Sequence, residues 1–111
     1  MNKISTASAE HYSWGQDCVG WLLLDGDDLT VVEECVPAGK SEARQRHAAA
    51  RQFFYVLHGE ATLEIDGRVH ALSAREGMHV PHGVAHQLRN AGNIDVRFLV
   101  VSSPDRGQAP A

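Results

Sequence analysis

Residues 37–59, PAGKSEARQRHAAARQFFYVLHG, decide the fold of this chain. The second half holds QFFYVL at 52–57, the strongest strand signal in the sequence, and it ends on the turn residues His58 and Gly59. The first half, 41–51, is rich in helix formers, but its only apolar residues are alanines, so a helix there would have no apolar stripe to bury. We expect a strand end and a loop, with at most one helical turn near Ala48–Ala50, and then a strand.

Turn signals divide the rest of the chain into short strands. Asp66 and Gly67 form the strongest hairpin signal, because this pair favours the tight turn that joins two antiparallel strands. Eight or nine short strands without a substantial helix predict an all-β sandwich or barrel. The expected strands lie at 19–24, 29–36, 52–57, 61–65, 69–72, 77–80, 85–89 and 96–102.

The bulk properties indicate one domain over residues 1–111, with a core at about 17–102 and a flexible tail at 103–111. A net charge of −4 argues against a nucleic-acid partner. The apolar runs are shorter than the roughly 20 residues that a membrane span needs, and the N-terminus lacks the apolar core of a signal peptide. We therefore expect a cytoplasmic protein, with Cys18 and Cys35 as reduced thiols.

A second stretch, GMHVPHGVAHQLRN at 77–90, reads as the partner of the first. Together the two stretches resemble the two motifs of the cupins, and the resemblance covers about residues 17–102. It is closest to the small, single-domain, type-2 members. The resemblance implies a conical β-barrel with jelly-roll topology (a double-stranded β-helix), usually paired as a homodimer. The matching residues are Gly39, His47, Gly59, Gly77, Pro81, Gly83, His86 and Asn90.

The resemblance also implies a site for one divalent transition metal, with zinc, nickel, iron and manganese not distinguishable. The family set is two histidines and a glutamate from the first motif and one histidine from the second. His47 and His86 match this set, whereas Gln45 stands at a histidine position and Gln52 at the glutamate position.

The two glutamines change the chemistry of the implied metal site. A glutamine coordinates only through a neutral carbonyl oxygen, so this set brings no negative charge to a divalent cation. One outcome is weak or absent metal binding, in a pocket of two hydrogen-bonded histidines beside two amides. The other is a metal bound together with an anionic substrate, such as a carboxylate, that supplies the missing charge.

Strand alternation indicates which further residues face the barrel. Phe54 shares the face of Gln52, and Leu88 lies two residues after His86, so both are expected to form the pocket wall. His79 is a candidate general base or extra ligand if it faces the barrel, and a rim or surface residue if it does not. Only one of the adjacent Glu33 and Glu34 can face inward, where it would replace the carboxylate that Gln52 lacks.

Three kinds of function remain open from the sequence. The first is a metal-dependent enzyme, of oxygenase or isomerase type, acting on a small and anionic molecule. The second is a non-catalytic binding protein or sensor that has lost its metal, and the third is a structural protein that uses only the dimer. The sequence contains no GxSxG motif and no phosphate-binding glycine loop.

Overall fold

The computed structural model describes residues 2–104 and consists of nine β-strands, with no helix in that range. No helix of the described residues therefore has the length and apolar character needed to cross a membrane. The strands are β1 (Glu10–Trp14), β2 (Cys18–Asp25), β3 (Thr30–Val36), β4 (Ala50–His58), β5 (Glu60–Ile65), β6 (Arg68–Ser73), β7 (Gly77–Val80), β8 (His86–Arg89) and β9 (Val96–Pro104).

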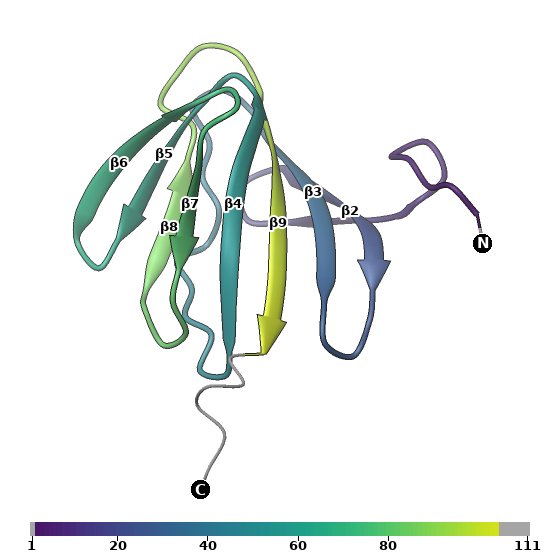
Figure 1. The fold of residues 1–111 in the computed structure, drawn as a ribbon. Coiled ribbons are helices and arrows are strands. Elements are labelled where there is room, and N and C mark those ends of the chain that lie inside the picture. The colour runs from purple at the N-terminus through teal and green to yellow at the C-terminus, as the bar shows by residue number, and fades with distance from the viewer. Residues whose placement is uncertain (1, 105–111) are drawn as a thin grey trace, which may run out of the picture.

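The strands form two antiparallel sheets, a larger one in the order β1-β2-β3-β9-β4-β7 and a smaller one in the order β6-β5-β8. Figure 1 shows the smaller sheet on one side of the molecule and strands β4, β9, β3 and β2 on the other. The core contains buried side chains of both sheets, with Phe54, Val56 and Phe98 from the larger and Leu63 and Leu88 from the smaller. This architecture confirms the predicted all-β class and jelly-roll barrel.

The hairpin between β5 and β6 follows directly from its two turn residues. Asp66 and Gly67 have φ values of 50° and 86°, and Ile65 pairs with Arg68 across the turn. Positive φ at both central positions is the tight turn whose twist matches the two strands, which is why an Asp-Gly pair predicts it. All eight predicted strands are present, and their ends differ from the predicted ones by at most two residues.

The segment at 37–49 contains no helical turn, and Ala50 already begins β4. It runs beside β8 instead. The backbone N–H of Glu42 donates to the carbonyl of Leu88 at 3.0 Å, and Gln45 and His86 exchange two backbone hydrogen bonds of 2.9 Å. Pairing with β8 satisfies these groups without a helix, so the segment carries Gln45 along the edge of the smaller sheet.

The first strand is the element that the sequence analysis missed. The predicted core began at about residue 17, whereas β1 already pairs with β2 from Glu10↔Leu22 to Trp14↔Cys18. This strand was not predicted because it is short and lies at the sheet edge with mostly exposed side chains, so the alternation of Tyr12 and Trp14 with polar residues in EHYSW is too brief to indicate a strand.

The last strand extends into the predicted tail, and both cysteines are free. Ser103 and Pro104 belong to β9, so the core extends two residues past its predicted end, and residues 105–111 of the tail lie outside the described part of the chain. Cys18 is buried and Cys35 partly buried, and both are free thiols, as expected.

Candidate functional site

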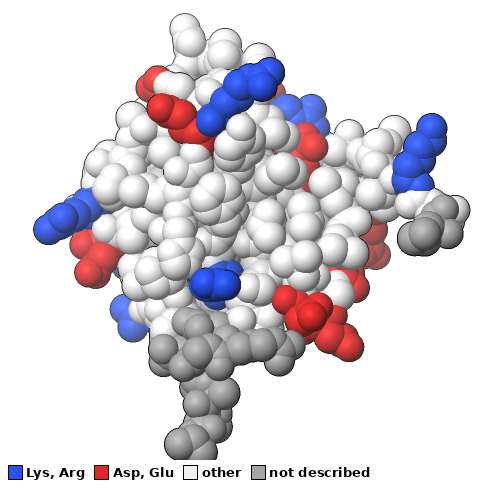
Figure 2. Space-filling view, viewed as in Figure 1, with Lys and Arg blue, Asp and Glu red and all other residues white. Residues whose placement is uncertain are grey.

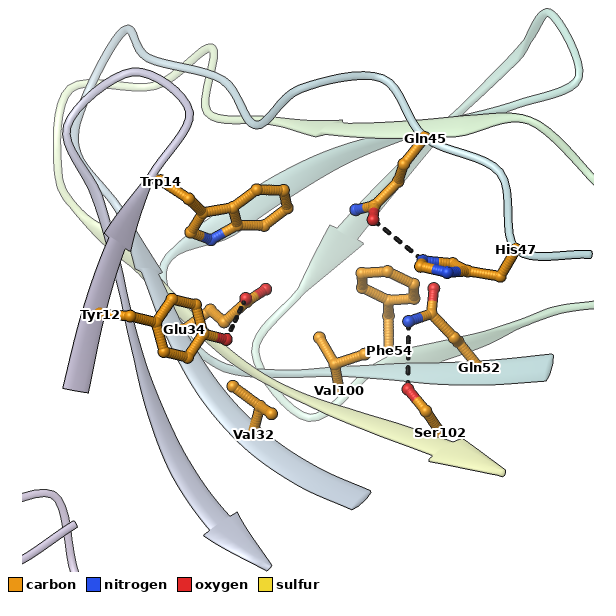
Figure 3. Close-up of a pocket in the computed structure, with 10 residues that line it drawn as sticks. All are labelled: Tyr12, Trp14, Val32, Glu34, Gln45, His47, Gln52, Phe54, Val100 and Ser102. Carbon is orange, nitrogen blue, oxygen red and sulfur yellow. Dashed lines mark hydrogen bonds between the residues drawn. The ribbon is translucent and has the colours of Figure 1, made fainter. Parts of the chain in front are cut away.

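A pocket of about 240 Å³ opens on the inner face of the larger sheet (Figure 3). Its wall combines apolar and polar side chains from β1, β3, β4, β9 and the 37–49 segment. The lining residues are Tyr12, Trp14, Val32, Glu34, Gln45, His47, Gln52, Phe54, Val100 and Ser102.

Gln45 and His47 form one side of the pocket and contact each other. The Oε1 atom of Gln45 lies 2.9 Å from Nε2 of His47. Because a carbonyl oxygen only accepts hydrogen bonds, Nε2 of His47 carries the hydrogen and donates it. His47 therefore presents a donor, and not a lone pair, at this nitrogen.

His86 lies behind the pocket wall and is only 1% exposed. Its ring packs edge-on against Phe54, with a centroid separation of 5.6 Å, and lies 5.9 Å from the ring of His47. Its Nδ1–H donates to the carbonyl of Val84 at 3.0 Å, so Nε2 holds a lone pair. This buried Nε2 has no hydrogen-bond partner among residues 2–104. Burial lowers the pKa of His86, which favours this neutral form.

Gln52 provides a second acceptor without a partner. Its Nε2 donates to the hydroxyl of Ser102 at 3.1 Å, which leaves Oε1 pointing away from that bond. Oε1 of Gln52 is buried and has no hydrogen-bond partner in the described part of the chain. Both unsatisfied atoms, Nε2 of His86 and Oε1 of Gln52, thus accept hydrogen bonds.

The opposite wall carries a carboxyl group, and two side chains of β1 surround it. Glu34 is 6% exposed, and Oη of Tyr12 donates to its Oε2 at 3.0 Å (Figure 3). The buried indole nitrogen of Trp14 is turned toward the same carboxyl group. Burial, with Glu34 as a further cause, raises the pKa of Tyr12 well above its usual value, so Tyr12 remains a donor.

The sequence contained a signal for Glu34, whereas the only signal for its β1 partners was the alternation of Tyr12 and Trp14 with polar residues. Alternation allowed only one of Glu33 and Glu34 to face inward. Glu34 pairs in register with the buried Phe98 and faces the pocket, whereas Glu33 bonds Arg97 on the outer face at 2.9 Å. Tyr12 and Trp14 were missed because their strand was missed.

Of the three predicted pocket residues, one lines the pocket and two lie elsewhere. Phe54 lines the pocket, as placed by its alternation with Gln52. Leu88 is fully buried in the core and does not line it. His79 lies on the outer face of the larger sheet, in a shallow hollow with Arg51 and Phe53.

The structure brings three of the four predicted metal ligands to the pocket wall and the fourth, His86, behind it. These residues do not fit a resident divalent cation. The set has no charge, and the Nε2 atom of His47 is occupied by its bond to Gln45. Within residues 2–104, no three side chains of His, Cys, Asp or Glu gather into a metal-binding group.

The chain is similar in sequence to proteins of one family. A family model described as "Cupin domain" matches residues 32–102. An oxalate-binding protein of Thermotoga maritima is 29% identical over 66 residues, which cover 60% of this chain and 54% of that protein. The chain spans less than two thirds of the length of the first curated relatives that it matches.

Solved structures share the fold. The crystal structure of a predicted oxalate decarboxylase from Thermotoga maritima has a TM-score of 0.82 at 20% identity, covering 91% of this chain and 97% of that one. The polyketide cyclase RemF of Streptomyces resistomycificus has a TM-score of 0.79 at 22% identity, covering 94% and 79%. At these identities the likeness shows the fold alone. The family match spans most of the chain, from β3 through β9, and with it the chain belongs to the cupin family.

Proposed function

We propose that the pocket binds a small organic molecule that donates hydrogen bonds, and that the protein works as a ligand-binding cupin without a resident metal. The observation that carries this proposal is a buried acceptor in the pocket lining, Oε1 of Gln52, which has no hydrogen-bond partner among the described residues. A buried polar atom without a hydrogen bond costs about 1–3 kcal/mol, so a ligand that donates to Oε1 of Gln52 gains that free energy on binding.

The charges of the pocket favour an uncharged or cationic ligand over the anionic one expected from the sequence. Within residues 2–104, Glu34 lines the pocket and no lysine or arginine does. Arg51 lies in the hollow on the outer face. An anion would therefore enter a pocket that already contains a carboxyl group and has no cation to balance the charge.

The two kinds of relative differ in ligand chemistry. Oxalate, for which the Thermotoga protein is named, is a small dianion. A polyketide, for which the cyclase is named, is an oxygen-bearing carbon skeleton with a large apolar surface. This pocket combines the apolar side chains of Trp14, Phe54 and Val100 with polar ones such as Gln52. Such a wall matches an apolar molecule that bears hydroxyl groups. The side chains that could ligate a metal, Gln45, His47 and Gln52, carry no negative charge. This also favours the binding of an organic ligand over metal-dependent oxygenase or isomerase chemistry.

A binding experiment on chelator-treated protein tests this proposal. Resorcinol, an uncharged aromatic diol that does not chelate metals, is expected to shift the indole N–H signal of Trp14 in an NMR titration, and oxalate is not. Gln52→Leu removes one acceptor and is expected to weaken resorcinol binding about fivefold, the equivalent of about 1 kcal/mol. Ser103→Ala, which alters the other face of β9, is the control.

The opposite result would favour the metal-and-anion alternative. If oxalate together with added zinc binds more tightly than resorcinol, or if the purified protein contains one metal ion per chain, the proposal is wrong. Metal analysis before and after chelation completes the experiment.

We also propose that the protein forms a homodimer through the outer face of the larger sheet. Phe53 is 43% exposed there and stacks on Tyr55 with ring centroids 6.3 Å apart. Figure 2 shows broad uncharged surface over β4 and β9, with charged side chains gathered mainly at the margins. An uncharged face with exposed aromatic rings is typical of association surfaces.

Light scattering after size exclusion measures the oligomeric state. Wild-type protein is expected to elute as a dimer and Phe53→Glu as a monomer, because the new carboxylate would have to be buried at the interface. Val69→Glu changes an exposed valine of β6 in the other sheet and should leave the dimer intact. A wild-type monomer at micromolar concentration would contradict the proposal.

A further inference from the structure

A second carboxyl group lies behind the pocket wall, against Glu34. Glu42, in the segment beside β8, is 1% exposed and lies within hydrogen-bonding reach of Glu34. Neither oxygen of Glu42 receives a hydrogen bond from any donor in the described residues. Two ionised carboxylates cannot remain in contact in such a buried place, so the pair holds a proton.

The surroundings decide which of the two carboxyl groups keeps the proton. The Glu34 carboxylate receives the hydroxyl of Tyr12 at 3.0 Å and faces the pocket, whereas an ionised Glu42 would have no donor at all. Burial raises the pKa of both carboxyl groups, but hydrogen bonds from Glu42, Tyr12 and Trp14 oppose this rise at Glu34. At Glu42 the charge of Glu34 adds to the effect of burial, and the pKa lies well above its usual range. Glu42 is therefore the neutral partner, and its O–H donates to Glu34.

We propose that Glu34 is the negatively charged anchor of the pocket and binds the ammonium group of a small organic cation, with the protonated Glu42 holding its carboxylate in position. This inference rests on the proposed ligand-binding function and narrows its ligand class. Glu42 acts through Glu34 and does not line the pocket itself.

The wall around Glu34 suits an organic cation in a second way. The aromatic rings of Tyr12, Trp14 and Phe54 line the same pocket. A cation near aromatic ring faces is attracted by their electron density, at about 0.5–1 kcal/mol when exposed and more when desolvated. An ammonium group would also neutralise a carboxylate that no lysine or arginine of the pocket lining balances.

The other titratable groups near Glu34 do not supply that balance. Tyr12 of β1 stays protonated at neutral pH because its pKa is raised. Cys18 of β2 has its pKa raised to about 11, first by burial and then by Glu42, so it remains a neutral thiol. Arg97 of β9 is bound to Glu33 on the outer face.

Three probes of one shape and different charge test the proposal. Benzylamine, benzyl alcohol and benzoate are titrated at pH 7 into the ¹⁵N-labelled full chain, and the indole N–H signal of Trp14 reports binding. The indole of Trp21, which lies under Arg97 on the outer face, is the internal reference. We expect benzylamine to bind about tenfold more tightly than benzyl alcohol.

Three variants assign the charge to one residue. Glu34→Gln is expected to abolish the preference for benzylamine. Glu42→Gln keeps a neutral donor beside Glu34, so the preference should persist, whereas it would disappear if Glu42 carried the charge. Glu33→Gln removes a carboxylate next in sequence but on the outer face, and should leave all three affinities as they are. Backbone amide spectra establish that each variant is folded.

The outcomes separate this inference from the proposed function. If benzyl alcohol binds and benzylamine binds no more tightly, or if Glu34→Gln keeps the preference, the ammonium site is wrong and the ligand-binding function stands. If benzoate binds best, or if none of the probes nor resorcinol shifts the Trp14 signal, both are overturned.

Discussion

At the scale of single residues, Gly20 makes the contact between Tyr12 and Glu34 feasible. Gly20 of β2 pairs with Tyr12 on one side and with Glu34 on the other. A Cβ atom added at Gly20 would overlap the phenol ring of Tyr12. The absent side chain leaves room for the ring to lie across β2 and to bring its hydroxyl to the carboxylate.

Gly20→Ala is therefore expected to displace Tyr12 and to lower the free energy of unfolding by about 1–3 kcal/mol, the usual cost of overpacking. Urea denaturation measures this change. Gly92→Ala is the matched control, because its Cβ would meet only Asn90 Oδ1, at 3.4 Å, and we expect a change within about 0.5 kcal/mol. Equal effects of the two substitutions would show that the phenol ring is not confined by Gly20.

Sequence spacing was informative for some residues and silent for others. Alternation with Gln52 indicated an inward position for Phe54, which lines the pocket in the structure. The same reasoning did not distinguish Leu88, which faces the core between the sheets, from a pocket residue. Alternation assigns a residue to a face of a sheet but does not say where along that face the cavity lies.

At the scale of the elements, Asn90 joins three parts of the chain. It follows β8, and its side-chain amide donates to the carbonyl of Val36 at 2.9 Å and to that of Ile94 at 2.7 Å. Its Oδ1 accepts the backbone N–H of Gly92 at 3.0 Å. The motif asparagine thus ties the end of β3 to the loop before β9.

Asn90→Ala is expected to destabilise the protein by about 1–3 kcal/mol, because the buried carbonyl of Val36 loses its amide donor. Thermal and urea unfolding measure the loss. Asn93→Ala changes an exposed residue of the same loop and serves as the control. A variant at position 90 as stable as the one at 93 would mean that these three bonds contribute nothing net.

The missed strand β1 shows a limit of pattern reading at this scale. A five-residue strand at a sheet edge with mostly exposed side chains offers only two alternating aromatic residues, so its sequence resembles a loop. Its pairing with β2 arises from backbone hydrogen bonds that any sequence can make. The Tyr12 and Trp14 side chains that it brings to the pocket are consequences of that pairing.

At the scale of the whole molecule, the buried carboxyl pair links stability to pH. Burial raises the pKa of Glu42 in the folded chain above its ordinary value of 4.5. The folded state therefore binds more protons than the unfolded state at pH values above 4.5, and the free energy of unfolding falls as pH rises toward the raised pKa.

Glu42→Gln removes this titration while keeping a neutral side chain of similar size. Its free energy of unfolding is expected to decline less than that of wild type as pH rises above 4.5, as measured by urea denaturation across a pH series. Glu10→Gln, at an exposed position of β1, is the control and should follow wild type. Parallel curves for wild type and Glu42→Gln would show that Glu42 ionises normally.

By itself, the sequence determined the all-β class, the positions of eight strands, the cupin family and the polar residues of the first motif, because these depend on local patterns and spacing. The tertiary structure alone decided the electrostatics of the pocket. Glu33 and Glu34 are equivalent by local pattern. The inner face of β3 carries Glu34 into contact with Glu42 and Tyr12, where burial raises the pKa of Glu34 and the hydrogen bonds from these two residues lower it. Desolvation depends on everything that surrounds a group, including side chains distant in sequence, so no local pattern predicts it.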